Sequence, residues 1–464
     1  MRRGFLTWLA LGLMTCAGMQ MLGCKSDQAT IIDGLTDEDV DRPLAPGEWG
    51  LVKLDPKDYP DMRSAFNDKE GLERAVDKSL QYMHAPSSHR FFPSGPITHS
   101  QVVASLEDIK KLLNTLPNGD AFQQQLLARY DVYESKGYNR KGDVWFTAYY
   151  TPIYYGSKVP TPEYRYPVYS RPNDLISDSV TGEIKGQRLP DGSMRPYPTR
   201  KEIVAGNLLR GLELAYFKDP LEPYIIQVQG SAKVIQPDGK ELFIGYAGKN
   251  GGEYRGLGAE LVKDGKIEKK KLSFPAVINY FKQHPAELND YVMRNDSFAF
   301  LKEYDPKEWP SGSLGVQVTP QRSLATDKSI FPRAALTFIT AEKPDQTGAV
   351  TPYRGFLLDQ DTGGAIRAAG RADIYLGIGE KAGLDAGKVY NKGHLYYLFL
   401  KSGQFSETPV LTPVVPPANL GKETPKTPKT PKITTTKPGV KPSNPATHTP
   451  MRPGDTEIFP NSNK

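Results

Sequence analysis

The stretch from Phe356 to Gly379 reads FLLDQDTGGAIRAAGRADIYLGIG. Its apolar start, 356–358, predicts a buried strand, and 372–376 predicts a second short strand. The glycine pair Gly363 and Gly364 between them indicates a sharp turn or a close approach to another group. The stretch carries three aspartates: Asp359, Asp361 and Asp373. Such carboxylates suit an acid held in a cleft, but Asp-Thr-Gly-Gly is equally the chemistry of a plain turn.

Six further segments accompany this stretch along the chain. They are FTAYYTP (146–152), YRYPVYSRP (164–172), TRKEIVAGNL (199–208), VQGSA (228–232), YAGKNGGEYRGLG (246–258) and TPQRSLATDKSIFP (319–332). Together with DTGGAI and the Ala-Asp-Ile-Tyr run, they resemble, in the same order, the MltA-type lytic murein transglycosylases with their C-terminal three-aspartate region. The resemblance covers roughly residues 143–400 and assigns Asp373 as the catalytic residue.

The resemblance implies a mainly β fold. It consists of a double-psi β-barrel domain, an inserted second, smaller β-rich domain, a groove between them, and N-terminal helices. The boundaries that we expect are 1–24 for a signal peptide, 25–46 for a spacer, 47–150 for the first part of the barrel domain, 151–312 for the inserted domain, 313–402 for the second part of the barrel domain and 403–464 for a tail.

The family's reaction cleaves the β-1,4 bond between N-acetylmuramic acid and N-acetylglucosamine in peptidoglycan. The 6-hydroxyl of the muramic acid attacks its own C1, and a 1,6-anhydro ring forms, a step that gains from proximity. One carboxyl can then act first as acid and afterwards as base. We assign both roles to Asp373 and give Asp361 the stabilisation of developing positive charge. Asp359 shares the face of Asp361 only if the chain stays extended.

Polar and glycine residues of the same motifs are the candidates for contact with glycan strands. They are Thr147, Tyr149, Gln229, Ser231, Tyr246, Asn250, Tyr254, Arg322, Gly363 and Gly364. Tyrosine suits sugars because its ring stacks on a pyranose while its hydroxyl bonds to the sugar. Each candidate also has a structural alternative, a half-buried strand or a turn, and Arg322 is as well explained as a partner of Asp327.

Two functions of other classes remain open. A hydrolase on the same barrel would divide acid and base duties between two carboxylates. An expansin-like protein would bind or loosen the wall without catalysis. No cofactor or metal is expected, since two cysteines and six histidines show no zinc-like spacing. The net charge of +6 is modest and spread along the chain, which gives no reason to expect nucleic acid.

The N-terminus begins with a short basic segment and an apolar run that ends in Met-Leu-Gly-Cys at Cys24. This pattern predicts a bacterial lipoprotein signal, with Cys24 as the lipidated residue. Lys25 does not resemble the aspartate associated with inner-membrane retention. We therefore expect an outer-membrane lipoprotein facing the periplasm, with proteins of wall synthesis as further candidate partners. The Pro/Thr/Lys-rich tail, 403–464, is predicted to be disordered.

Apolar periodicity predicts helices over 71–84, 99–116 and 119–134, packed on the barrel. Thr199 and Glu202 form a capping-box pattern that predicts a helix through about Phe217. The runs 224–229 and 241–246 predict a hairpin about a Pro-Asp-Gly turn. Further strands are expected at 315–318, 335–340 and 394–400.

Overall fold

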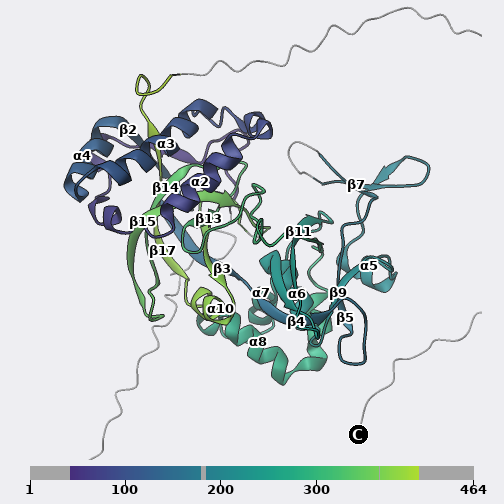
Figure 1. The fold of residues 1–464 in the computed structure, drawn as a ribbon. Helices are drawn as coiled ribbons and strands as arrows, with labels where there is room; N and C mark the ends of the chain where they lie inside the picture. The colour runs from purple at the N-terminus through teal and green to yellow at the C-terminus, as the bar shows by residue number, and fades with distance from the viewer. Residues whose placement is uncertain (1–41, 179–183, 365, 407–464) are drawn as a thin grey trace, which may run out of the picture. The chain divides into compact units, whose positions relative to one another are not determined.

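The computed structural model describes residues 42–178, 184–364 and 366–406 (Figure 1). All of these described residues belong to one compact unit. The predictions for Cys24, for most of the 25–46 spacer and for the tail beyond residue 406 lie outside the described residues. Within the described ranges, no helix has both the length and the apolar character needed to cross a membrane.

A closed six-stranded barrel carries the stretch that opens the sequence argument. Its strands are β3 (Asp143–Thr151), β13 (Ser323–Ala325), β14 (Leu336–Pro344), β15 (Val350–Asp361), β16 (Arg371–Ile378) and β17 (Asn391–Leu400). The order around the barrel is β3-β17-β14-β15-β13-β16, and β16 pairs with β3 again. The pairs β13–β15 and β16–β3 are parallel and the others antiparallel. The predicted strands at 356–358 and 372–376 are confirmed as parts of β15 and β16.

Strand β17 closes the barrel because its two halves have different neighbours. Asn391–His394 pairs with β3, whereas Tyr396–Leu400 pairs with β2 (Tyr130–Ser135), which lies outside the ring and pairs in turn with β1 (Leu51–Lys53). Closure leaves none of the six strands with an unpaired edge along its whole length. The predicted mainly β architecture with a closed barrel is confirmed.

Three N-terminal helices pack on this barrel and share its hydrophobic core. They are α2 (Leu72–Met83), α3 (His99–Thr115) and α4 (Gly119–Arg129). In Figure 1, α2 and α3 lie beside the barrel strands; α2 contacts β15 and α3 contacts β17. The third predicted helix is too long: it ends at Arg129, because the backbone of Tyr130 is extended and opens strand β2.

A second six-stranded sheet is formed wholly by residues between Ile153 and Glu303, in the order β12-β11-β10-β4-β9-β5. Its strands are β4 (Ile153–Ser157), β5 (Tyr166–Tyr169), β9 (Glu213–Phe217), β10 (Ser231–Ile235), β11 (Glu241–Lys249) and β12 (Ala299–Glu303). A small sheet comprises β6 (Leu175–Ser177), β7 (Ile184–Arg188) and β8 (Met194–Arg195). These elements have hydrophobic clusters of their own, separate from the barrel core.

The remaining helices are short. They are α5 (Arg200–Ala205), α6 (Leu221–Gln229), α7 (Leu257–Lys263), α8 (Phe274–Gln283), α9 (Leu288–Val292) and α10 (Glu380–Ala386). Single 3-10 turns are η1 (Pro56–Asp58), η2 (Arg63–Asn67), η3 (Pro86–Phe91), η4 (Lys269–Lys271) and η5 (Pro285–Glu287).

Three local predictions are wrong. The run 224–229 lies in helix α6, which ends at Gly230 in the left-handed conformation, and the hairpin about the Pro-Asp-Gly turn joins β10 to β11. The helix opened by the Thr199 capping box ends at Ala205, and 213–217 is strand β9. Residues 315–318 form no strand, only an isolated bridge between Gln317 and Ser311.

Candidate active site

Two of the three aspartates lie in one row across the barrel. Asp361 on β15 pairs with Ala325 on β13, Ala325 pairs with Asp373 on β16, and Asp373 pairs with Thr147 on β3. Residues paired across neighbouring strands point to the same face of a sheet. Strands lie about 4.8 Å apart, so the backbones of the two aspartates are about 10 Å apart. The barrel therefore presents both carboxylates on one face; we call Asp361 and Asp373 in this arrangement the carboxylate row.

A β-bulge separates Asp359 from this pair. Leu324 pairs with Asp359 and its neighbour Ala325 pairs with Asp361, so that Gln360 is the extra residue on β15. Successive strand residues point to opposite faces, and one extra residue reverses that alternation. Asp359 consequently follows Leu324 into the interior, where it is fully buried, while Asp361 follows Ala325 toward Asp373.

Asp373 has one anchored oxygen and one open oxygen. The Thr147 hydroxyl donates to Oδ1, and Nε of Arg371 lies 3.5 Å from the same oxygen. Within the described part of the chain, no group hydrogen-bonds to Oδ2. The side chain is 15% exposed. It is thus held in a fixed orientation and remains accessible, which is the geometry needed for proton transfer to a bound ligand.

Asp361 has both oxygens occupied by donors. The Tyr149 hydroxyl donates to Oδ2 at 2.7 Å, and the backbone N–H groups of Ser313 and Thr362 each donate to Oδ1 at 2.8 Å. Burial raises the pKa of Asp361 above its usual value, although these three donors and the charge of Lys328 oppose the rise. Asp361 is therefore a positioned acceptor, with no oxygen left without a donor.

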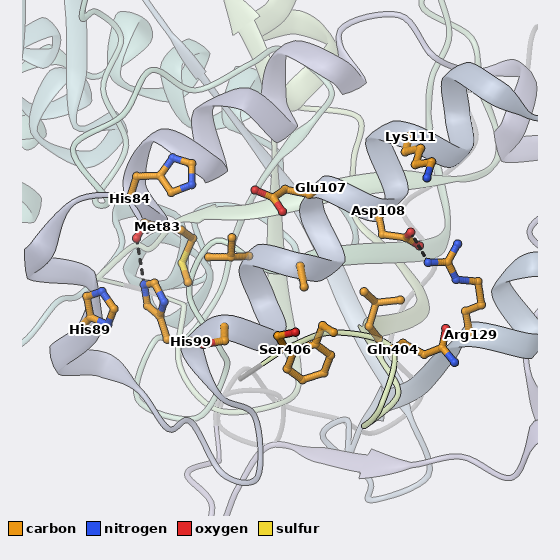
Figure 2. Close-up of a pocket in the computed structure, with 15 residues that line it drawn as sticks. Met83, His84, His89, His99, Glu107, Asp108, Lys111, Arg129, Gln404 and Ser406 are labelled. Carbon is orange, nitrogen blue, oxygen red and sulfur yellow. Dashed lines mark hydrogen bonds and ion pairs between the residues drawn. The ribbon is translucent and has the colours of Figure 1, made fainter. Parts of the chain in front are cut away.

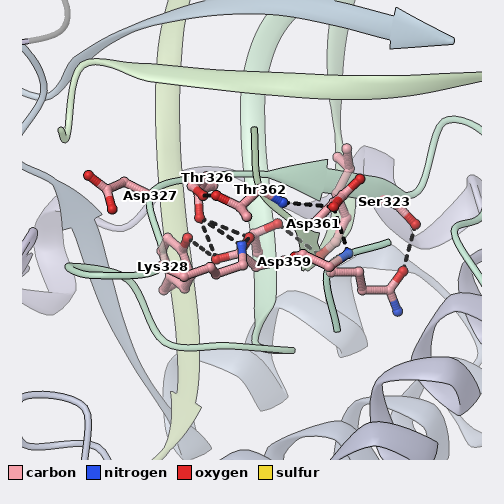
Figure 3. A network of polar contacts seen from close by, with 12 residues as sticks. Ser323, Thr326, Asp327, Lys328, Asp359, Asp361 and Thr362 are labelled. Atoms are coloured by element: carbon pink, nitrogen blue, oxygen red, sulfur yellow. Dashed lines mark hydrogen bonds and ion pairs between the residues drawn. The ribbon is translucent and has the colours of Figure 1, made fainter. Parts of the chain in front are cut away.

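The buried Asp359 is the centre of a polar network (Figure 3). Its carboxylate pairs with Lys328 and accepts hydrogen bonds from the hydroxyls of Thr326 and Tyr397 at 2.7–2.9 Å. Thr326 also donates its backbone N–H to the backbone oxygen of Asp361 at 3.1 Å. The first aspartate thus supports the barrel from inside and does not face the carboxylate row.

Gln229 and Ser231 lie where the second sheet meets strand β3. The Tyr150 N–H donates to Oε1 of Gln229 at 3.1 Å. The hydroxyls of Ser231 and Thr151 are 3.1 Å apart, and the Thr151 hydroxyl is 3.0 Å from that of Tyr375. Both predicted residues therefore have a structural partner on strand β3. Gln229 lies at the end of helix α6, whereas the sequence predicted the end of a strand.

The glycine-rich segment after β11 divides into structural and accessible residues. Asn250 is buried, and its side chain bonds to the backbone at Pro198, Gly252, Asp296 and Phe298. It has no capacity left for a sugar. Tyr246 is 44% exposed. Burial raises the pKa of Tyr254; the neighbouring Tyr224 and Asp373 raise it further, and the charge of Arg371 lowers it.

Arg322 does not belong to the candidate site. Its guanidinium is buried, pairs with Asp68 and donates to the Tyr353 hydroxyl and to the backbone oxygens of Glu70 and Phe356. It ties the N-terminal segment to the barrel. The alternative pairing with Asp327 is also wrong, because that carboxylate accepts from the backbone N–H groups of Ser329 and Ala368.

The hollow of about 600 Å³ in Figure 2 lies away from the carboxylate row. Its lining comes from the N-terminal helices and the end of β17, with His84, His89, His99 and the Asp108–Arg129 ion pair. Neither Asp361 nor Asp373 lines it. This hollow is therefore not the candidate active site, despite its size.

Two contributors to the row were missed from the sequence. Arg371 precedes Asp373 by two residues in a strand, so their shared face was a usable signal. Ser313 donates its backbone N–H to Asp361 from a distant loop, and no local sequence pattern indicates this role.

The glycine pair lies in the loop between β15 and β16, as predicted. Gly363 is half-buried and Gly364 is exposed.

Comparison with known protein families matches two models. Residues 145–302 match the MltA specific insert domain, and residues 322–399 match the 3D domain. The membrane-bound lytic murein transglycosylase A of Escherichia coli K12 is 33% identical over 276 residues, which cover 58% of this chain and 69% of the relative. That of Vibrio cholerae is 32% identical over 285 residues, covering 60% and 71%.

Solved structures agree with these matches. A membrane-bound lytic murein transglycosylase from Agrobacterium tumefaciens superposes with a TM-score of 0.64 at 26% identity, covering 76% of this chain and 98% of that one. E. coli MltA with bound chitohexaose superposes with a TM-score of 0.57 at 24% identity, covering 77% and 98%, and supports the fold alone. On the extent of these matches, the chain belongs to the MltA family of membrane-bound lytic murein transglycosylases.

Proposed function

We propose that this protein is a peptidoglycan lytic transglycosylase. It cleaves the β-1,4 bond between N-acetylmuramic acid and N-acetylglucosamine and leaves a 1,6-anhydromuramic end. Membership of the family supports the reaction class. The single structural observation that carries the assignment is the Asp373 carboxyl, with one oxygen bonded to Thr147 and the other open.

Asp373 is the proton carrier in this proposal. Its carboxyl donates a proton to the bridging oxygen, and the N-acetylglucosamine leaves as the C1–O bond breaks. The 6-hydroxyl of the muramic acid then bonds to C1 and returns its proton to the carboxylate, so that the enzyme ends as it began and no water is consumed. Thr147 and Arg371 hold the carboxyl in place and act as positioning residues.

Asp361 stabilises the positive charge that develops on the sugar. It is fixed by Tyr149, Ser313 and Thr362, and charge that is already oriented costs no reorganisation during the reaction. Tyr246, Tyr254 and the backbone of Gly363 and Gly364 are the sugar contacts that we retain. The same proposal places the glycan strand in the groove expected between the barrel and the inserted domain, 151–312.

Mass spectrometry of products tests this function. Purified murein, incubated with lipid-free protein in ¹⁸O-labelled water, should yield anhydro-muropeptides without ¹⁸O at C1. A hydrolase would instead give reducing ends that carry ¹⁸O. A protein that acted without catalysis would release neither, and either of these results would contradict the proposal.

Tyr149→Phe should shift the acidic side of the pH–activity profile to higher pH. Asp361 must be ionised to stabilise cationic charge, so activity falls as the pH drops through its pKa. The Tyr149 hydroxyl bonds to the ionised form and lowers that pKa; removing it therefore raises the pKa of Asp361. The measurement is kcat/KM on murein across the acidic range. Activity lost uniformly at every pH, or a shift downward, would contradict the role given to Asp361.

Tyr155→Phe is the matched control for this profile. Tyr155 is also a β-strand tyrosine, but its side chain is 61% exposed on β4. Its replacement should leave the profile unchanged.

We also propose that the protein is anchored in the outer membrane through lipidated Cys24 and faces the periplasm. The Met-Leu-Gly-Cys sequence supports this location, and the relatives are named as membrane-bound. The mass of the N-terminal peptide from membranes tests it: a diacylated or triacylated Cys24 is expected, and an unmodified or uncleaved N-terminus would contradict it.

A further inference from the structure

Two cations flank the second glycine of the DTGGAI loop. A Cβ built on Gly364 would lie 3.9 Å from Nζ of Lys249, the last residue of β11. Nε of Arg367 donates to the backbone oxygen of the same Gly364 at 3.2 Å. One cation therefore comes from the second sheet and the other from the loop between the two aspartate strands.

Among the residues that the structure describes, no acid neutralises either cation. In residues 42–178, 184–364 and 366–406, no carboxylate pairs with Lys249 or Arg367. Lys249 is half-buried, and burial together with the charge of Arg367 lowers the pKa of Lys249. Two like charges brought together without a counter-charge are unfavourable, and an anion bound between them would relieve this.

The place of this pair relative to the carboxylate row limits what the anion can be. Gly364 follows Asp361 by three residues, so their Cα atoms lie within about 11 Å. A sugar bound at the row would therefore bring its substituents toward the two cations. Muramic acid differs from N-acetylglucosamine in its 3-O-lactyl group, which ends in a carboxyl or continues into a peptide stem with free carboxylates.

We propose that Lys249 and Arg367 form a carboxylate-binding subsite, which recognises the acidic substituent of muramic acid beside the cleaved bond. The inference rests on the proposed function for the identity of the strand. Lysine and arginine both form charge-assisted hydrogen bonds with carboxylates, and arginine can do so through two parallel bonds. The subsite gives the protein a means to distinguish murein from an uncharged N-acetylglucosamine polymer.

Equilibrium binding in an Asp373→Asn background tests the subsite without cleavage of the ligand. The probes are soluble murein strands with intact stems, strands stripped of stems by an amidase, and chitohexaose. Lys249→Gln and Arg367→Gln should each weaken binding of at least one of the two murein probes by about tenfold or more, because a charge-assisted bond is lost. Chitohexaose, which has no carboxylate, should bind the variants and the parent protein within about twofold.

The stripped strands distinguish the two sources of the carboxylate. The stem is joined to the lactyl carboxyl through an amide, so intact strands offer only stem carboxylates and stripped strands only the lactyl carboxylate. A loss confined to intact strands identifies the stem as the ligand, and a loss confined to stripped strands identifies the lactyl carboxyl. A loss for both shows that either acid is bound. Lys249→Arg and Arg367→Lys should retain most of the affinity. Lys282→Gln removes an equal charge from an exposed position on α8 and should have no effect.

Equal losses for all three probes, or no loss for any, would overturn the subsite. Arg367 is exposed in a loop, so its variant alone decides the question if Lys249→Gln is unstable. The binding result is separate from the reaction. Charge-dependent binding without anhydro products from the parent enzyme would refute the proposed function and leave the subsite standing.

Discussion

Asp373→Asn should reduce the release of anhydro-muropeptides by about a hundredfold to ten-thousandfold, the usual contribution of a positioned acid–base group. Asparagine has nearly the same shape, and its Oδ1 can still accept the Thr147 hydrogen bond, so the barrel should remain intact. What is lost is the exchangeable proton at the open oxygen. Product quantification by mass spectrometry, with the unfolding temperature as a second measurement, checks this expectation.

The matched control is Asp290→Asn, which makes the same replacement at an exposed position on α9. It should retain full activity. An Asp373→Asn protein that folds like the parent and keeps more than about a tenth of its activity would refute the catalytic role, because such a loss is below the range for an acid–base group. The non-catalytic wall-binding alternative would then gain support.

The two strands of the aspartate stretch could be predicted from the sequence, because short apolar runs bounded by glycine and aspartate are strong local signals. The fact that Asp359 and Asp361 point to different faces could not be predicted. Both lie on one strand two residues apart, and simple alternation places them on the same face. The bulge at Gln360 depends on pairing with Leu324 and Ala325, 35 or more residues earlier, and no local pattern encodes it.

The polar site candidates show a second limit. Arg322 and Asn250 are of residue types that bind sugars, and their motifs resemble those of the family. Whether their hydrogen-bonding capacity is already used depends on distant partners, such as Asp68, which lies 254 residues from Arg322 in the sequence. The sequence indicated motifs and residue types that suit sugar binding, but not which of these side chains remain free to bind.

Helix α6 illustrates ambiguity at short range. The apolar run at 224–226 suits a strand as well as one buried turn of a helix, and periodicity cannot separate the two over so few residues. Pro220 before the helix and left-handed Gly230 after it are the boundary signals that favour the helix.

Lys328→Met should destabilise the protein by about 3–5 kcal/mol, because it leaves the Asp359 carboxylate buried without its counter-charge. The side chains are 5% and 0% exposed, so water cannot replace the lost partner. Thr326 and Tyr397 would still donate to the carboxylate, but neither carries a charge. The measurement is the free energy of unfolding from urea titration.

Lys158→Met provides the comparison, since its ion pair with Glu303 joins side chains that are 46% and 54% exposed. Loss of such a surface pair should cost about 0–1 kcal/mol. The double variant Lys328→Met/Asp359→Asn removes both buried charges, so its cost should be less than the sum of the two single costs by about 0.5–3 kcal/mol. Strict additivity would show that the two groups do not act as a pair.

The Lys328 variant should also change the pH dependence of activity, because the charge of Lys328 affects the pKa of Asp361. The charge of Lys328 lowers the pKa of Asp361, so its removal should raise that pKa and move the acidic limb of activity to higher pH, as expected for Tyr149→Phe. Tyr149 is half-buried and is not part of the buried ion pair, so its variant should show this shift with a much smaller loss of stability. If both variants shift the limb and only Lys328→Met lowers stability strongly, the interior network tunes the second carboxylate as well as supporting the barrel. If Lys328→Met lowers stability without moving the limb, the network is structural only.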